Sequence, residues 1–197
     1  MKTAVQMVHY FLQEHLPGAK FILDGTAGNG RDTLFLARHS PDDATIWAFD
    51  IQEAALNNTR KLLAAHELEN KVIYILDNHA NVKNHIQHFL DLAVFNLGYL
   101  PGGCHAITTR TDTTLQAVTS ILPLLTTGGV VSITAYPGHE AGLAEQTALE
   151  AFLSKLPQEK FSVGKWQMLN QVNAPPVVYI IEKVRGVCNE RTTTRQN

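Results

Sequence analysis

The chain has 197 residues, of which 45% are hydrophobic and 17% charged, so it can bury one core and is too apolar to be disordered. Its formal net charge of -2 at pH 7 gives no overall attraction for nucleic acid, although a local basic patch stays compatible with it. No apolar run approaches the roughly 18 residues of a membrane helix, and Cys104 and Cys188 form neither a disulfide framework nor a zinc-binding spacing. We expect a single domain over residues 1–197 in a reducing, cytoplasmic setting, away from membranes.

The first element is an amphipathic helix. Apolar residues recur at helical spacing from Thr3 to Leu16, and Pro17-Gly18 ends the pattern. Gln, His and Glu interrupt its apolar face, which argues against a signal peptide. We expect this N-terminal helix, within residues 1–18, to cover one edge or face of a sheet.

The stretch KFILDGTAGNGRDTLFL follows. Phe21 to Leu23 is a short buried strand by composition, and the three glycines after it force a turn. Helical spacing resumes at Arg31. A strand, a glycine turn and a helix together present backbone N–H groups to a nucleotide or nucleoside.

The residues of this turn discriminate between ligands. Gly28 and Gly30 match the first two glycines of the dinucleotide fingerprint, but Thr33 occupies the third position. Asp24 would repel a pyrophosphate and suits a cationic ligand such as S-adenosylmethionine, which carries an amine and a sulfonium. The turn is similar to motif I of class I methyltransferases, except that Thr26 replaces a glycine, which requires a negative φ there. A NAD-dependent dehydrogenase is the disfavoured alternative.

Two later strands also end in acids. Thr45–Phe49 precedes Asp50, which lies 20 residues after Gly30, where nucleoside-binding folds place a ribose-binding carboxylate. A helix N-cap is the alternative role for Asp50. Lys71–Leu76 precedes Asp77, which can accept from an adenine amino group or form an ordinary Asp-Asn turn.

Three histidines follow Asp77. His85 and His88 are expected on one face of a helix, and together with His79 they could suggest a metal site. No cysteine or carboxylate accompanies them at a metal-binding spacing, so we expect solvated histidines and no metal.

The loop NLGYLPGG follows a fourth strand, Asp91–Phe95. Ligands of doubly wound sheets lie outside the carboxyl ends of the strands, so Asn96 should emerge beside the cofactor. The loop resembles motif IV of amino-methyltransferases, N-P-P-Y, with Leu97-Gly98 in place of the prolines. An Asn oxygen and a main-chain carbonyl can accept both hydrogens of an amine, and Tyr99 can stack on the base that carries it. A Gly/Pro-rich surface loop is the alternative.

The rest of the chain completes a Rossmann-like α/β fold. We expect a doubly wound, mostly parallel seven-stranded sheet with an antiparallel C-terminal edge hairpin, and a frayed tail over 189–197. The expected elements are a helix from Thr111 to Leu125, a strand from Val130 to Tyr136, a helix from Gly142 to Leu156, and strands over Lys160–Leu169 and Pro176–Glu182.

Several motifs together resemble the YtqB/MnmM family of bacterial class I methyltransferases. They are DGTAGNGRDTLFLA, AFDIQEAAL, FNLGYLPGG, AYPGH with the later Glu145, and LNQVNAPPVVYIIEK, which span most of the chain. The resemblance implies a tRNA substrate, the anticodon stem-loop, in which wobble 5-aminomethyl-2-thiouridine becomes 5-methylaminomethyl-2-thiouridine. Cys104-His105 departs from the acidic-basic pair more usual in the family.

The motifs and the resemblance give two sets of site residues. Those expected to bind S-adenosylmethionine are Asp24, Thr26, Gly28, Asn29, Gly30, Asp50, Gln52, Asp77, His79 and Asn96. Those expected to bind the substrate are Leu97, Gly98, Tyr99, Pro101 and Arg110.

The chemistry requires a neutral amine, because only that form has a lone pair. His139, after the fifth strand, is the best general-base candidate, and a histidine that only holds the loop is the alternative. Arg110, Lys165 and Arg185 are candidates for phosphate contacts. The expected catalytic residues are Asn96, Tyr99 and His139.

Other functions stay open from the sequence. They are methylation of an rRNA base, N- or O-methylation of a small molecule, and cofactor binding for regulation without catalysis. A cytosine-C5 enzyme is disfavoured, because the residues around Cys104 lack its pattern. The oligomeric state is open, and a homodimer is one arrangement.

Overall fold

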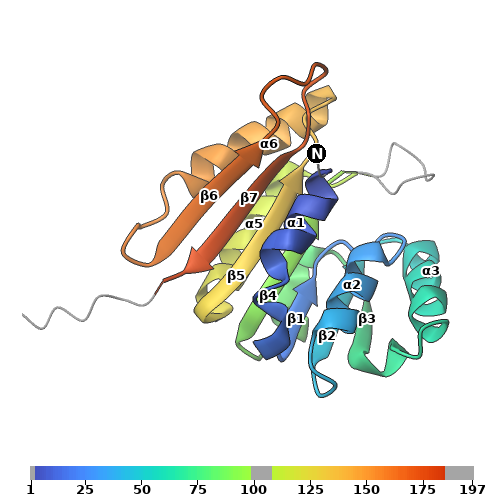
Figure 1. Ribbon diagram of the computed structural model, residues 1–197. Coiled ribbons are helices and arrows are strands. Elements are labelled where there is room, and N and C mark those ends of the chain that lie inside the picture. Colours follow the sequence, from blue (N-terminus) through green and yellow to red (C-terminus); the bar gives the residue numbers. More distant parts are fainter. Residues whose placement is uncertain (1–2, 99–107, 185–197) are drawn as a thin grey trace, which may run out of the picture.

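A computed structural model describes residues 3–98 and 108–184. Seven strands form one sheet in the order β3-β2-β1-β4-β5-β7-β6 (Figure 1). Only β7 runs antiparallel to its neighbours, β5 and β6, so the predicted Rossmann-like fold and C-terminal hairpin are confirmed. The strands are β1 (Phe21–Asp24), β2 (Thr45–Asp50), β3 (Val72–Leu76), β4 (Leu90–Asn96), β5 (Leu125–Ala135), β6 (Phe161–Gln167) and β7 (Val177–Lys183).

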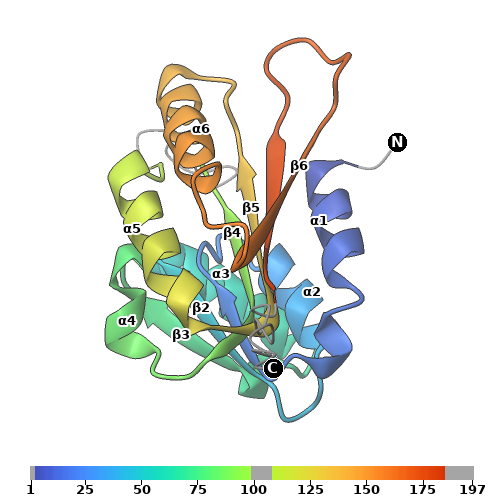
Figure 2. The ribbon, with the colours of Figure 1, turned by 90° about the vertical axis from the view of Figure 1, so that its left-hand side faces the viewer.

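Helices cover both faces of the sheet (Figure 2). One apolar core joins the sheet to α1, α2 and α3, and a second core joins its other face to α4, α5 and α6. No described helix is long and apolar enough to cross a membrane. The helices are α1 (Ala4–Leu12), α2 (Arg31–His39), α3 (Glu53–Ala64), α4 (Val82–His85), α5 (Thr111–Ile121) and α6 (Glu140–Leu153), with short 3-10 turns between some of them.

The inner strands are apolar on both faces because each strand contributes side chains to both cores. Successive residues of a strand point to opposite faces. In β1, Ile22 packs with α1 and α2, whereas Leu23 packs with α4 and α5. In β4, Val94 and Phe95 divide between the two cores in the same way. The polar residues at the strand ends are thereby left for the carboxyl edge of the sheet.

The N-terminal helix is shorter than predicted. It begins after Thr3, whose side chain and that of Gln6 form a capping box, and it ends at Leu12. The chain then makes a separate 3-10 turn over Leu16–Gly18. Pro17 lies inside this turn, where its missing N–H prevents the α-helix from continuing through it.

Two other predictions about helices are wrong. The helix expected to reach Leu125 ends at Ile121, because Pro123 interrupts it, and Leu125 already begins β5. His85 and His88 do not share a helix face, because α4 ends at His85. Within the described residues, no group of three or more His, Cys, Asp or Glu side chains is arranged to hold a metal ion.

Candidate functional site

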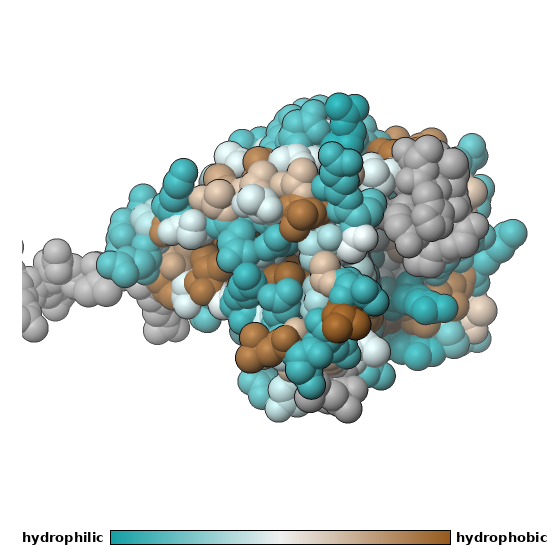
Figure 3. All heavy atoms as spheres, turned by 90° about the horizontal axis from the view of Figure 1, so that it is seen from above, coloured by the Kyte–Doolittle hydropathy of each residue, from teal (hydrophilic) through white to brown (hydrophobic). Residues whose placement is uncertain are grey.

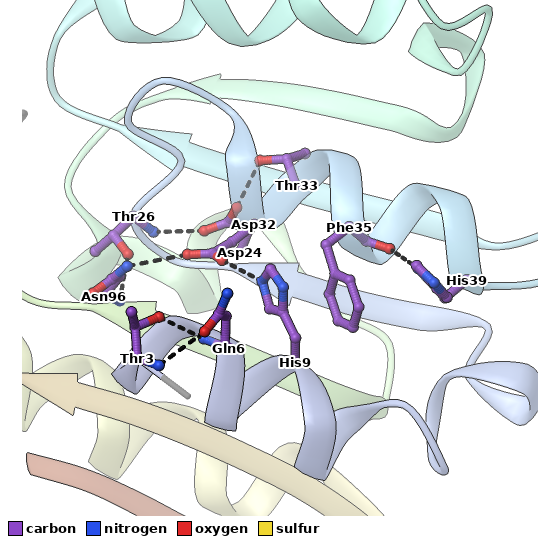
Figure 4. Close-up of polar contacts among 10 residues, drawn as sticks. All are labelled: Thr3, Gln6, His9, Asp24, Thr26, Asp32, Thr33, Phe35, His39 and Asn96. Atoms are coloured by element: carbon purple, nitrogen blue, oxygen red, sulfur yellow. Dashed lines mark hydrogen bonds and ion pairs between the residues drawn. The ribbon is translucent and has the colours of Figure 1, made fainter. Parts of the chain in front are cut away.

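The candidate site lies where the strand order reverses. β1 and β4 are neighbours at the centre of the sheet, and the chain continues outward from each in opposite directions. In such sheets ligands bind outside the carboxyl ends of the strands at this switch point. Figure 3 views the molecule from this edge, where hydrophilic side chains surround scattered apolar ones. Polar residues from α1, β1, α2 and β4 meet below this edge (Figure 4).

The glycine turn between β1 and α2 is shaped by close contacts. Gly30, the N-cap of α2, has a φ of 80°, and a Cβ there would lie 2.8 Å from the Thr59 Cα. A Cβ on Gly25 would overlap the ring of Phe95. Thr26 is not among the described residues with positive φ, so the predicted condition for its place in the motif is met.

Asp24 is fully buried beneath this turn. Its two oxygens accept from the Thr26 N–H at 3.1 Å and from the Thr33 hydroxyl at 2.6 Å. Burial first, and then the charge of Asp32, raise the pKa of Asp24 to about 7. Its direct contact with a cofactor stays a prediction. Thr33 holds this acid, which accounts for its place in the motif.

Asp50 is half-buried at the end of β2 and organises the turn. Its Oδ2 accepts from the Gly28 N–H and its Oδ1 from the Gln52 N–H, both at 2.9 Å. Burial raises its pKa, and these hydrogen bonds oppose the rise. Each oxygen retains acceptor capacity, as ribose binding requires. The alternative role as N-cap is excluded, because that residue of α3 is Gln52.

Ile51 was missed by the sequence analysis. It follows Asp50 directly and is 51% exposed, so it offers an apolar surface beside the ribose-binding candidate. The signal was available as an apolar residue immediately after a strand-end acid.

Asn29, in the glycine turn, accepts from the side chain of Asn58 at 3.2 Å.

Asp77, at the end of β3, makes internal contacts. Its Oδ1 accepts from the Asn81 side chain at 2.8 Å, and its Oδ2 lies 2.8 Å from His85 Nε2. His85 first, and then Asn81, lower the pKa of Asp77. These contacts fit the turn alternative, and the adenine contact stays a prediction.

His79 is buried behind the glycine turn, so the prediction that it is solvated is wrong. Its Nδ1 lies 3.1 Å from the Gly25 carbonyl oxygen, which can only accept, so Nδ1 carries the proton. Nε2 is buried with no hydrogen-bond partner among the described residues. Burial lowers the pKa of His79, so the ring is a neutral acceptor beside the turn.

Asn96, the last residue of β4, links the turn to α2 (Figure 4). Its N–H donates to the Thr26 hydroxyl at 2.7 Å, and its Nδ2 donates to Asp32 Oδ2 at 3.1 Å. Its Oδ1 is buried and makes no hydrogen bond to a described residue. Asn96 therefore offers one unpaired acceptor at the switch point.

Tyr136, just after β5, is a second residue that the sequence analysis missed. Burial first, and then the charge of Asp32, raise the pKa of its phenol, while the Asn96 side chain lowers it. Asn96 is thus close enough to influence Tyr136, although no hydrogen bond of good geometry reaches its Oδ1. An aromatic residue at the end of an apolar strand was the available signal.

Leu97 and Gly98 are held in place from both sides. Leu97 is buried in the core, so only its main chain could meet a substrate. Gly98 donates its N–H to the Thr109 hydroxyl at 2.8 Å, and its carbonyl accepts from the Thr109 N–H at 3.0 Å. The Thr109 hydroxyl donates in turn to Glu145 Oε2 at 2.8 Å. Hydrogen bonds through Thr109 to Glu145 therefore support the main chain at Leu97 and Gly98.

Glu145 of α6 is buried and was assigned no role from sequence. Besides Thr109, it accepts from the Thr114 hydroxyl at 2.7 Å. Burial raises its pKa, and the two threonine hydroxyls and His139 act against that rise. His139 is exposed at the N-cap of α6, so the structure brings it near Glu145, while its role as a base stays a prediction.

The cationic candidates are partly engaged. Lys165 Nζ lies 2.8 Å from Glu150 Oε2, and exposed Arg110 lies 3.6 Å from Asp112. The phosphate contacts stay predictions. Other predicted residues lie outside the described residues, namely Tyr99, Pro101, Cys104, His105 and Arg185.

These residues fit S-adenosylmethionine. Asp50 offers acceptors for a ribose, and the adjacent turn is too crowded at Gly25 and Gly30 for larger residues. Asp24 lies fully buried beneath this turn and accepts from the Thr26 N–H. The bound group would supply an electrophilic methyl, and Asn96 would present its free oxygen to an amine.

Comparison with known proteins agrees with this geometry. Residues 46–182 match the family described as "Putative rRNA methylase". A curated Arabidopsis thaliana protein, "tRNA (mnm(5)s(2)U34)-methyltransferase, chloroplastic", is 32% identical over 200 residues, which cover 92% of this chain and 70% of that protein.

Solved structures give the same result. A Clostridium thermocellum protein that carries the same description as the family is 36% identical with a TM-score of 0.91, covering 93% of this chain and 99% of that one. A Streptococcus mutans structure in complex with SAH is 36% identical with a TM-score of 0.85, at the same coverage.

Proposed function

Since the chain belongs to the rRNA methylase family of S-adenosylmethionine-dependent methyltransferases, we propose that it N-methylates the 5-aminomethyl group of wobble 2-thiouridine in tRNA. The Arabidopsis relative that is 32% identical is named for the same nucleoside position. The resemblance of the sequence motifs to the YtqB/MnmM family implies the same nucleoside.

One observation carries the proposal, the unpaired Oδ1 of Asn96. The atom is buried with no partner among the described residues, and leaving a buried acceptor unmade costs about 1–3 kcal/mol. A ligand that donates an N–H would remove this cost. Asn96 is tied to Thr26 of the glycine turn through its own N–H, so the donor would lie beside the bound cofactor.

The residues of the chain divide the work of the reaction. Asp50 and the glycine turn hold the nucleoside end of the cofactor, and S-adenosylmethionine supplies the methyl group. Asn96 Oδ1 accepts one hydrogen of the amine and so fixes the direction of its lone pair, and orientation of this kind accounts for much of a transfer rate. His139 is proposed to take up the proton that the amine must lose.

A second candidate is methylation of an rRNA base, because the family description names rRNA. Small-molecule methylation has less support, since the O-methyltransferase neighbours are at most 14% identical and show the fold alone.

Methyl transfer to bulk RNA separates these substrates. The purified protein and labelled S-adenosylmethionine are incubated with tRNA and with rRNA from a strain that lacks the protein. We expect label in tRNA only, as 5-methylaminomethyl-2-thiouridine in nucleoside mass analysis. Label in rRNA, or none in either RNA, would overturn the proposal.

A further inference from the structure

We propose that Asp32 is a positioning residue that sets the orientation of the Asn96 amide, and that His9 of the N-terminal helix holds Asp32 in place. The inference rests on the proposed function, because it concerns the same amine acceptor. It adds two residues from α1 and α2 to a site that the motifs placed only at strand ends.

The geometry shows Asp32 shared between two elements (Figure 4). Its Oδ2 accepts from Asn96 Nδ2 at 3.1 Å, and its Oδ1 lies 2.8 Å from His9 Nε2. The Asp32 side chain is only 12% exposed. One carboxylate therefore joins α1, α2 and the end of β4.

A carboxylate decides which way the amide points. An Asn side chain carries a donor and an acceptor of nearly the same shape, and their order follows from the partners. An ionised Asp32 can only accept, so Nδ2 of Asn96 faces it and Oδ1 faces away, where it stays unpaired. Without Asp32 the amide could turn over and offer an N–H to the substrate amine, which would remove the acceptor.

The His9 ring is held by packing against α2 as well as by its contact with Asp32. Its ring stacks on Phe35 of α2, with centroids 3.7 Å apart and an interplanar angle of 2°. Val5 and Val8 of α1 close a small hollow beside Asp32 and Asn96 that is too narrow for a water molecule. Water therefore does not compete for these atoms inside the hollow, and α1 shields the contact between Asp32 and Asn96 on this side.

A simpler role for Asp32 predicts a different outcome. It lies in the first turn of α2, where an acid stabilises a helix through the macrodipole. Glu53 also lies in the first turn of its helix, α3, and is exposed. Glu53→Gln is therefore a matched control for loss of a first-turn charge.

The test measures single-turnover methyl transfer to tRNA at saturating S-adenosylmethionine, with SAH affinity measured by calorimetry. Asp32→Asn keeps the size but lets both amide orientations occur. We expect the rate to fall at least about tenfold, with the SAH affinity and the tRNA KM unchanged. Glu53→Gln should keep the wild-type rate. An Asp32→Asn rate equal to wild type would overturn the inference.

A double-mutant cycle shows whether Asp32 acts through Asn96. In the Asn96→Ala background, Asp32→Asn should add no further loss of rate. If the full loss appears there too, Asp32 acts independently and the inference fails. If Asn96→Ala alone keeps the wild-type rate, Asn96 is not the amine acceptor and the inference fails with it. If the wild-type protein itself transfers no methyl group to tRNA, the proposed function fails instead.

His9→Phe decides the matter if Asp32→Asn does not fold. The phenyl ring can keep the stack on Phe35 while losing the contact with Asp32. We expect a loss of rate of about threefold to tenfold with an unchanged melting temperature. A variant with the wild-type rate would remove His9 and α1 from the site.

Discussion

The two halves of the candidate site are built differently. In the cofactor half, carboxylates accept from main-chain N–H groups of nearby turns, as Asp50 does from Gly28 and Gln52. In the amine half, side chains from distant elements contact one another, as His9, Asp32 and Asn96 do. The first arrangement is a property of a short motif, whereas the second exists only once the helices have packed.

The two halves should respond differently to substitution. A substitution in the cofactor half should change ligand affinity or turn stability. A substitution in the amine half should leave cofactor affinity unchanged and alter rate or local packing.

The largest expected effect concerns Asp24 in the cofactor half. Its pKa rises from 3.8 to about 7 on folding, so between these pH values the folded protein keeps a proton that the unfolded chain has lost. Its contribution to the unfolding free energy is therefore present below pH 4 and is lost as the pH rises toward 7, by at most about 4 kcal/mol. The Asp24→Asn variant should lack this decline. Urea unfolding from pH 4 to 8 measures both slopes, and equal slopes would contradict the assignment.

Asp50→Ala should weaken the binding of S-adenosylmethionine by about 1–3 kcal/mol, because ribose hydroxyls and two main-chain donors lose their acceptor. The rate at saturating cofactor should change little. Calorimetry measures the affinity, with Asp43→Asn, on the surface, as the control. An unchanged affinity in Asp50→Ala would remove Asp50 from the ribose site.

Glu145→Gln tests the base of the amine half. The Gln side chain has one acceptor oxygen where Glu has two, so either the Thr109 or the Thr114 hydroxyl loses its acceptor. We expect the unfolding free energy to fall by about 1–2 kcal/mol. Cofactor affinity should stay unchanged. Glu140→Gln, exposed on the same helix, should cost less than about 1 kcal/mol. A loss of cofactor affinity in Glu145→Gln would erase the division between the halves.

The smallest effect is expected at the surface. If tRNA binds electrostatically, its affinity falls as salt rises, and Arg110→Ala should reduce the logarithmic slope by about one phosphate contact. Lys165→Ala should change it less, because Glu150 already pairs with that lysine. Filter binding over a salt series measures both. A flat response in the wild type would favour a small-molecule substrate.

The same division explains what could be predicted from sequence. The strand β1, the helix Arg31–His39 and the placement of Asp50 follow from apolar runs and glycine spacing, which are local. Asp32 received no role from the sequence, because its contact with Asn96 spans 64 residues. No role could be assigned to Glu145 from the sequence, because its hydrogen-bond partners Thr109 and Thr114 precede β5 in the chain whereas Glu145 follows it.

The errors in helix ends have a different cause. The apolar spacing continues up to Pro17 and past Pro123, so both predicted helices were too long at their C-terminal ends. A proline prevents the turn before it from forming regular helix. The apolar pattern therefore extends beyond the end of the helix itself.

The most direct test of the central claim is the single-turnover rate of Asn96→Ala on tRNA at saturating S-adenosylmethionine, with cofactor affinity measured on the same preparation. If Asn96 Oδ1 orients the amine, the rate falls by roughly a hundredfold or more and the cofactor affinity stays at the wild-type value. A variant that keeps its rate, or that loses cofactor affinity in place of rate, would contradict the account.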